Sequence, residues 1–329
     1  MQLQTITLAS AIIGAISALE THGGYDYETR FKPDASPETN AIKDSYEATA
    51  AEQAYTRLQE KVQLTGVAHQ CLNFTEGAQP ATLYALKDCI AADSKGNFFK
   101  LLAEDIENSN DFWGEILLES TNNRTQWVPA RAWTKCYFNG DLTAVQFAAW
   151  SLSPNADAAN LHANPEHFYK ETTLDASGSQ SSQIFEGWGG VLSKFGTART
   201  NFLVPAFSTP VYGTENTPAA WDIGVKFPLP LQRVGDKVLA SGGQETFGVL
   251  HIAVRDFAAS EGTTGKSGIE IYSAVWYPPW DQASEEDKAE FVNNYLADEA
   301  HHMVVEVINL TLQAHEDCKT GLCVLPSGK

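Results

Sequence analysis

Two apolar, aromatic-rich runs in the second half of the chain constrain its fold more than any other stretch. They lie within residues 244–277 and are separated by the polar segment 258–268, which contains three glycines. Runs rich in β-branched and aromatic residues on either side of such a loop are typical of an antiparallel hairpin. We therefore predict a β-sheet core organised around this hairpin.

The two-residue period of a strand sorts the side chains of this hairpin into faces. One face of the first run carries Val249, His251, Ala253 and Arg255, and one face of the second run carries Glu270, Tyr272, Ala274 and Trp276. Some registers place Arg255 opposite Glu270 as an ion pair, although sequence alone does not fix the register. Ionisable groups in such apolar strands predict a cavity wall that faces a small molecule.

The candidate catalytic residues are His251, Arg255, Tyr272 and Glu186, and the candidate substrate-binding walls are Trp188 and Trp276. Histidine titrates near neutral pH, arginine and tyrosine are hydrogen-bond donors that can polarise a carbonyl group, and tryptophan offers a flat apolar surface. Two simpler interpretations stay open. A core histidine satisfied by one neighbour would account for His251, and a turn at a strand end would account for Glu186.

The rest of the chain predicts an α+β fold: an antiparallel β-sheet or barrel core with an N-terminal helical region and a long C-terminal helix. Residues 40–92 are expected to be helical. Apolar residues recur every four positions from Ile42 to Val62, and a second helix is expected at 82–92 with Leu83, Leu86 and Ile90 inward. Residues 284–316 are expected to form the C-terminal helix, with a buried seam from Val292 to Ala314.

Residues 97–280 are expected to be mainly β. Short apolar runs at 98–102, 112–118, 127–137, 142–152 and 181–190 predict further strands, and Asn139-Gly-Asp141 predicts a hairpin turn. Residues 20–38 are expected to be an extended arm. Loops are expected at 154–165 and at 202–230, and Asn164-Pro-Glu-His167 is expected to form a loop turn.

Several features predict secretion. Residues 1–18 have the apolar run and small residues of a signal peptide, which leaves 19–329 as a single secreted domain. Glycosylation sequons stand at Asn73, Asn123 and Asn309. The five cysteines leave one unpaired in an oxidising compartment. Cys318–Cys323 and Cys71–Cys89 are the most economical disulfides and leave Cys136, whereas pairing of Cys136 with Cys71 or Cys89 stays open.

Composition and missing motifs restrict the function. The formal net charge is −19, which argues against nucleic acid and anionic membranes as partners. No segment after the signal peptide is long and apolar enough to span a membrane. The sequence has no Gly-x-Ser-x-Gly elbow, no dinucleotide-binding glycine motif and no phosphate-binding loop. We therefore expect a chain without cofactors whose partner is an apolar or aromatic small molecule.

The C-terminal helix carries a candidate metal-binding motif. Glu299-x-x-His302 has the spacing of a helical carboxylate–histidine metal pair, and Glu306 lies on the same face. No second helix of this kind is present in the sequence, so the favoured interpretation is a solvated polar face without a metal.

Four stretches resemble a group of secreted, glycosylated fungal proteins encoded in secondary-metabolite clusters. They are His162-Ala-Asn-Pro-Glu-His167, Phe185-Glu-Gly-Trp-Gly-Gly190, residues 248–256 and residues 272–277. The layout of residues 95–315 is similar to that of the hetero-Diels–Alderases of tropolone-sesquiterpenoid pathways. This resemblance implies a cycloaddition, without a cofactor, between a quinone-methide-like diene and an apolar terpenoid alkene.

The expected function is thus that of a cyclase, lyase or isomerase acting on an aromatic or terpenoid metabolite. The alternative is a non-catalytic secreted glycoprotein that binds an apolar small molecule. A structural or host-interacting glycoprotein and a metalloenzyme built on the C-terminal helix are further alternatives.

Overall fold

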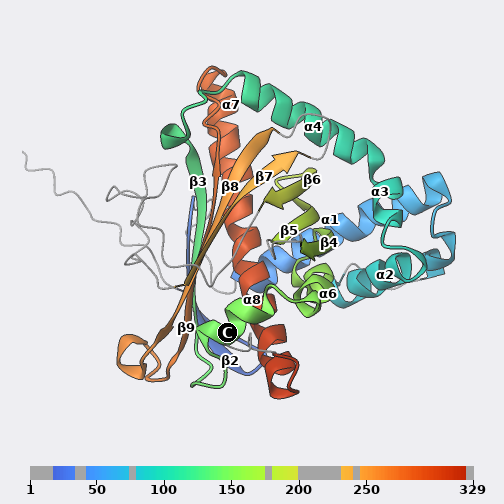
Figure 1. Cartoon of the computed structure of the whole chain (residues 1–329). Helices are drawn as coiled ribbons and strands as arrows, with labels where there is room; N and C mark the ends of the chain where they lie inside the picture. Colours follow the sequence, from blue (N-terminus) through green and yellow to red (C-terminus); the bar gives the residue numbers. More distant parts are fainter. Residues whose placement is uncertain are drawn as a thin grey trace, which may run out of the picture.

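In the computed structural model, nine strands form one antiparallel sheet in the order β1-β2-β3-β9-β8-β7-β6-β5-β4 (Figure 1). The structure describes residues 18–33, 42–73, 79–174, 180–198, 231–239 and 245–323. The strands are β1 Ala18–His22, β2 Tyr25–Lys32, β3 Val128–Cys136, β4 His167–Leu174, β5 Gln180–Trp188, β6 Val191–Ala198, β7 Leu231–Leu239, β8 Thr246–Phe257 and β9 Gly268–Tyr277. The α+β prediction is confirmed, and within the described residues the sheet is open, with β1 and β4 at its edges.

The helices precede, interrupt and follow the strands. They are α1 Ile42–Thr65, α2 Pro80–Asp93, α3 Asn97–Leu101, α4 Ala103–Leu118, α5 Ala144–Trp150, α6 Pro154–Ala163, α7 Glu285–Glu290 and α8 Ala297–Lys319. A π-helical segment, Phe291–Leu296, joins α7 to α8. The predicted N-terminal helices and C-terminal helix are therefore present, although Val292 at the start of the predicted seam is exposed.

The predicted hairpin is β8 and β9, and it lies in the middle of the sheet. β9 pairs with β8 on one side and with β3 on the other. Every residue of β9 is buried, so both faces of the sheet are covered at this strand. Arg255 lies opposite Glu270, and their side chains are 2.5 Å apart, which confirms the predicted ion pair.

Helices cover the two faces of the sheet differently. α8 runs along the inner face and contacts β2, β3 and β9 from one half of the sheet and β5 from the other (Figure 1). On the outer face of β4–β6, Phe168, Phe185 and Leu192 pack in one cluster with apolar residues of α1, α2 and α3. The sheet therefore curls around α8, and α8 is buried on most of its circumference.

A separate aromatic cluster forms on the outer face of β3, β9 and β8. It contains Trp133, Tyr272 and Trp276 from the strands, together with Trp127, which precedes β3. This is the face on which the sequence placed the polar groups of the hairpin. The cluster and the residues against α8 thus lie on opposite sides of the same strands.

Three predicted strands are helices in the structure. Residues 98–102 lie in α3 and the following turn, 112–118 lie in α4, and 142–152 contain α5. In α4 the buried residues Ser109, Trp113 and Ile116 recur every three or four positions, which is the helical period. α5 begins at a capping box formed by Thr143 and Gln146, a helix-start signal that outweighs the apolar character of the run.

Turn and cap residues explain the other differences between the predicted and the observed elements. The expected arm at 20–38 contains the hairpin β1–β2, whose Gly23-Gly24 turn has positive φ at both positions, as such hairpins require. The expected loop at 154–165 contains α6, which starts with Ser153 as N-cap and Pro154 in its first turn. Asn139 and Gly140 do form a turn with positive φ, but it leads from β3 toward α5 and not into a hairpin.

Both predicted disulfides are present, Cys71–Cys89 and Cys318–Cys323, and Cys136 is the buried free thiol among the described cysteines. Among the sequons, Asn123 is exposed. The Asn309 amide instead donates to a Glu47 carboxylate oxygen and to the carbonyl of Ala163, which engages the nitrogen that would carry a glycan. The side chain of Asn73, residues 202–230 and residues 1–17 of the predicted signal peptide lie outside the described part of the chain.

No helix in the described part of the chain has the length and apolar character needed to cross a membrane.

We predict opposite effects for two glycine-to-alanine substitutions. A Cβ at Gly268 would overlap the carbonyl oxygen of Cys136 on the neighbouring strand, so G268A should lower the free energy of unfolding by more than about 2 kcal/mol. A Cβ at Gly114 in α4 would meet no atom within 4 Å, so G114A should raise it by about 0.5–1 kcal/mol. Urea denaturation of both variants measures the difference, and a G268A variant as stable as wild type would contradict this account of the β3–β9 contact.

Candidate functional site

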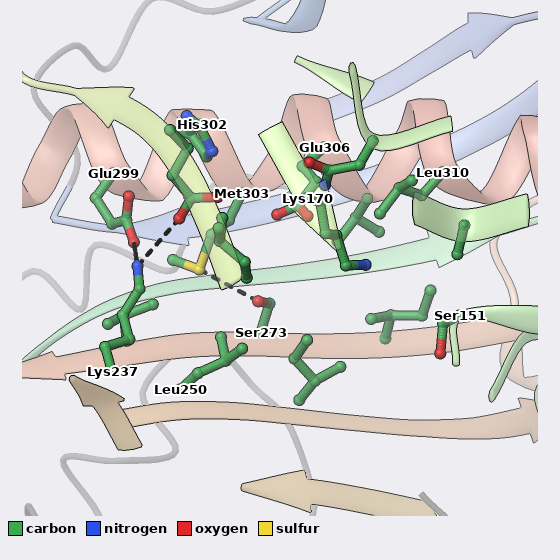
Figure 2. Close-up of a pocket in the computed structure, with 18 of the residues that line it drawn as sticks. Ser151, Lys170, Lys237, Leu250, Ser273, Glu299, His302, Met303, Glu306 and Leu310 are labelled. Carbon is green, nitrogen blue, oxygen red and sulfur yellow. Dashed lines mark hydrogen bonds and ion pairs between the residues drawn. The ribbon is translucent and has the colours of Figure 1, made fainter. Parts of the chain in front are cut away.

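A cavity of about 70 Å³ lies between α8 and the inner face of the sheet. It follows α8 from Glu299 and Lys237 at one end to Leu310 and Ser151 at the other (Figure 2). Its walls are mostly apolar side chains from α5, the strands and α8: Phe147, Trp150, Ile184, Phe195, Leu250, Ile252, Ile271, Val275, Met303, Val307 and Leu310. It has more room than one water molecule needs and less than the roughly 300–1,000 Å³ of a pocket for a drug-sized ligand.

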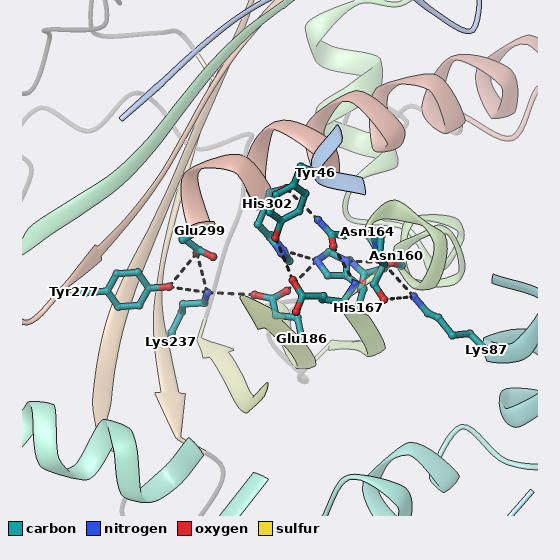
Figure 3. A network of polar contacts seen from close by, with 12 residues as sticks. Tyr46, Lys87, Asn160, Asn164, His167, Glu186, Lys237, Tyr277, Glu299 and His302 are labelled. Atoms are coloured by element: carbon teal, nitrogen blue, oxygen red, sulfur yellow. Dashed lines mark hydrogen bonds and ion pairs between the residues drawn. The ribbon is translucent and has the colours of Figure 1, made fainter. Parts of the chain in front are cut away.

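One end of the cavity is strongly polar. The ammonium of Lys237 lies 3.2 Å from a carboxylate oxygen of Glu186, 3.6 Å from one of Glu299 and 3.5 Å from the hydroxyl oxygen of Tyr277 (Figure 3). The Tyr277 hydroxyl donates to Glu299 at 2.9 Å. The Lys237 ammonium also lies 4.1 Å from the ring centroid of Trp188, where a cation–π contact adds to the ion pairs.

Local sequence places these groups together. Lys237 and Tyr277 both point to the inner face beside Gly248 on the strand between them, and a Cβ at Gly248 would lie 3.1 Å from the Tyr277 ring and 3.3 Å from the Lys237 stem. The glycine therefore leaves the space that the two side chains occupy. Glu299 reaches the same point from the first turn of α8.

A second set of polar groups continues behind the cavity. Nδ1 of His167 is 3.0 Å from the carbonyl oxygen of Asn160, and its Nε2 is 2.8 Å from Nε2 of His302 and 3.4 Å from a carboxylate oxygen of Glu186 (Figure 3). Glu186 therefore joins this set to the Lys237 cluster. Within the described residues, His167, Glu186 and His302 are the group whose ligand atoms are close enough to hold a metal ion, all lying within 4.8 Å of one another.

The network extends further to α1 and α2. The hydroxyl of Tyr46 donates to Glu166 at 3.1 Å and to Asp298 at 3.3 Å. Lys87 is fully buried and donates to the backbone carbonyls of Asn164 and Pro165. The Tyr46 contacts link the residue before β4 to α8, and the Lys87 contacts link the preceding residues to α2. Together they fix the start of β4, where His167 lies beside His302.

Burial changes the acid–base properties of the site. Burial, opposed by the Lys237 charge and reinforced by Glu186, raises the pKa of Glu299 to about 7. Burial also raises the pKa of Glu306 to about 7, and it lowers the pKa of His302 to about 3, with the Lys237 charge acting in the same direction. Near neutral pH, Glu299 can therefore exist as an acid or as a base, which suits proton transfer.

The structure divides the residues predicted from sequence into two groups. Glu186 and Trp188 lie on the inner face, where Glu186 lines the cavity and Trp188 packs under Lys237. His251, Arg255, Tyr272 and Trp276 lie together on the outer face of β8 and β9. A single pocket containing all six residues is therefore not formed, because alternation along the strands directs the two groups to opposite sides of the sheet.

The outer group has its own contacts. The ring of His251 lies edge-on to Tyr272, with centroids 5.5 Å apart, and burial lowers the pKa of His251 to about 4. Arg255 pairs with Glu270 and also with Glu261 at 2.8 Å. A catalytic role for these residues stays a prediction.

The favoured interpretation of the polar stretch on the C-terminal helix was wrong. Glu299 and His302 are 1% and 2% exposed, so they are not part of a solvated face. The sheet and α6 pack around α8 on several sides, and an exposed polar face is therefore not available to these residues. Asn164–His167 was expected to form a turn. In the structure His167 begins β4 and takes part in the polar network behind the cavity.

Sequence reasoning missed Lys237, Tyr277 and His167. The segment that forms β7 was not predicted as a strand, so nothing placed Lys237 in the interior. The run Val234-Gly-Asp-Lys-Val-Leu239 does not alternate between apolar and polar residues, so it carries no clear signal for a strand. The partners of His167 and Lys237 come from other elements, and their proximity follows from the strand order.

Comparison with models of known protein families gave no match, and comparison with curated proteins gave none either.

We predict that Glu299 contributes to a loss of stability as pH rises through neutral. Its pKa in the folded protein is about 7 against a usual value of 4.5, so the native state holds the proton more tightly than the unfolded chain. The resulting stability is complete below about pH 4.5 and is lost as pH rises through about 7. E299Q should therefore show a smaller fall in the free energy of unfolding between pH 6.5 and pH 8 than wild type.

This window avoids the opposite effect of the buried histidines. Their lowered pKa values cost stability only below about pH 6.5, the usual value for histidine. Urea denaturation at four pH values from 6.5 to 8 measures the slope, and E285Q, which changes an exposed glutamate of α7, is the matched control. Equal slopes for E299Q, E285Q and wild type would contradict the prediction.

Proposed function

We propose that the protein is a cyclase, lyase or isomerase that binds an apolar or aromatic small molecule in the cavity beneath α8 and uses its own side chains for catalysis. The observation that carries the proposal is the cluster of Lys237, Glu299 and Tyr277 at one end of an otherwise apolar cavity. Apolar walls with a few convergent polar groups and a displaced pKa are the general signature of such a site.

The polar end has a defined chemical role in this proposal. The Lys237 ammonium donates a hydrogen bond to a carbonyl oxygen of the substrate and stabilises negative charge that develops there. Glu299, with a pKa of about 7, gives a proton to the substrate or takes one from it, and Tyr277 orients the carboxyl group. The apolar walls hold the remaining carbon skeleton in a reactive arrangement.

The resemblance to hetero-Diels–Alderases makes this reaction class more specific. A hydrogen bond from Lys237 to the oxygen of a quinone-methide-like diene would make that diene a better electron acceptor, and the apolar walls would suit a terpenoid alkene. A cavity of about 70 Å³ is small for two such partners, so the cycloaddition requires the cavity to widen on binding. Secretion belongs to the same proposal and is supported by the two disulfides.

The alternative function is binding without catalysis. The apolar majority of the cavity lining favours it, because an apolar ligand could be held there without any use of Lys237 or Glu299. The two functions differ in what happens to the bound molecule.

Asymmetric product formation tests the proposal. The purified protein is incubated with an ortho-quinone methide generated in solution and a cyclic terpene alkene, and the adduct is analysed by chiral chromatography. When the quinone methide and the alkene are both achiral, the uncatalysed reaction gives a racemic adduct, so we expect an enantiomeric excess with wild type. K237Q and E299Q should lower the rate about 100-fold, the size expected for loss of one preorganised donor.

Outer-face variants provide the matched controls. Y272F and H251Q change the group that lies on the other side of β8 and β9, and they should retain the enantiomeric excess. Loss of selectivity in these two variants and not in K237Q or E299Q would move the site to the outer face. Tight binding of both reactants with a racemic product at the background rate would favour the non-catalytic alternative.

A further inference from the structure

Three buried side chains from different elements converge on one point beside the cavity. His167 begins β4, Glu186 lies near the end of β5, and His302 lies on the second turn of α8. All three residues are buried, with exposed fractions of 0%, 8% and 2%. Two imidazoles and a carboxylate are a ligand set found in zinc sites with three protein ligands. We propose that His167, Glu186 and His302 bind a divalent transition-metal ion of the zinc type.

Two of the three distances between ligand atoms fit this ligand set with a small adjustment, and all the ligand atoms lie within 4.8 Å of one another. Bonds of about 2.0–2.1 Å in a tetrahedral arrangement place ligand atoms about 3.3 Å apart. Nε2 of His167 is 3.4 Å from the Glu186 carboxylate, which needs no change. Nε2 of His167 is 2.8 Å from Nε2 of His302, and this pair must separate by about half an ångström to admit the ion.

The hydrogen bond behind His167 prepares it as a ligand. The Asn160 carbonyl oxygen, 3.0 Å from Nδ1, can only accept a hydrogen bond. The proton of His167 is therefore on Nδ1, and Nε2 presents its lone pair toward Glu186 and His302. A backbone carbonyl on the other ring nitrogen is the usual outer contact of a metal-binding histidine.

The surrounding charges favour a cation at this point. Glu186, Glu299 and Glu306 interact electrostatically with one another in this region, and Lys237 pairs with the first two. Lys170 is paired with Asp157 at 3.6 Å. When ionised, the three carboxylates exceed by one the combined charge of Lys237 and of Lys87, whose charge also acts on His167 and His302.

The ion would connect α8 to β4 and β5, and its fourth coordination position would be left to water or to a molecule in the cavity that Glu186 and His302 line. The inference goes beyond the proposed function, because the acid–base cluster of Lys237 and Glu299 acts without the ion. It departs from our expectation of a chain without metal, since that expectation considered only the residues of the C-terminal helix.

Metal analysis and direct titration test this site independently of any activity. The purified protein is analysed for zinc, iron, manganese, nickel and copper by mass spectrometry, then stripped with a chelator and titrated with ZnCl₂ while thermal stability is recorded. We expect about one ion per chain in wild type and a rise in melting temperature on reloading. CoCl₂ in place of ZnCl₂ should give the intense visible absorption of tetrahedral cobalt.

Substitutions identify the ligands. H167Q and H302Q should weaken zinc binding by more than the 10- to 100-fold that outer-shell changes cost, whereas H301Q, which changes the neighbouring residue on α8, and H251Q should bind as wild type does. Zinc binding unchanged in H167Q and H302Q would overturn the proposal. A stripped wild-type protein that takes up no zinc and gives no tetrahedral cobalt spectrum would overturn it without reliance on the variants.

Discussion

The site depends on the ion pairs that the buried ammonium group of Lys237 makes. Lys237 is 2% exposed, and removing a charge from water costs several kcal/mol unless partners compensate. Glu186 on β5 and Glu299 on α8 provide the opposite charges, and the rings of Trp188 and Phe195 lie within 4.5 Å of the ammonium. Because these partners come from different elements, the ion pairs fix the position of α8 relative to β5 and β7.

The same burial gives the site its chemistry. A carboxyl group beside a buried cation would ordinarily have a lowered pKa, yet loss of solvent and the nearby carboxylates outweigh Lys237 and raise the pKa of Glu299 to about 7. The walls a few ångströms away are apolar. A bound molecule would therefore meet an acid–base group and a fixed cation with little competition from water, which strengthens each electrostatic contact.

Sequence predicted the parts of the structure that depend on local pattern. The β8–β9 hairpin, α1, α2 and the C-terminal helix follow from periodicity and loop composition. Cysteine spacing marked the two observed disulfides as the most economical pairs but left pairing of Cys136 with Cys71 or Cys89 open. The aromatic content of residues 98–102, 112–118 and 142–152 predicted strands, but helical spacing and the Thr143 capping box make these segments helical. The Gly23-Gly24 turn was missed in a segment interpreted as an arm.

The site depends on the pairing of strands that are far apart in the sequence, and local sequence patterns do not predict this pairing. Alternation correctly separated the two faces of β8 and β9, but it did not tell which face lies against α8. Glu186, a candidate from the sequence, lines the cavity, whereas Lys237 and His167 acquire their roles only from the strand order that places β7 beside β8 and β4 beside β5. The polar residues of α8 were predicted to be exposed to solvent because a helix is seldom enclosed by a sheet on several sides.

Met303 gives the most direct measurement of whether the cavity admits an apolar molecule. The chain has two methionines, Met1 and Met303, and Met303 lines the cavity. The ¹³C-labelled methyl group of Met303 therefore reports on this space in an NMR spectrum that contains at most one other methionine signal. Titration with a monoterpene hydrocarbon such as limonene should shift the Met303 signal in a saturable manner. A Met303 signal that stays unchanged up to the solubility limit of limonene would contradict the central claim.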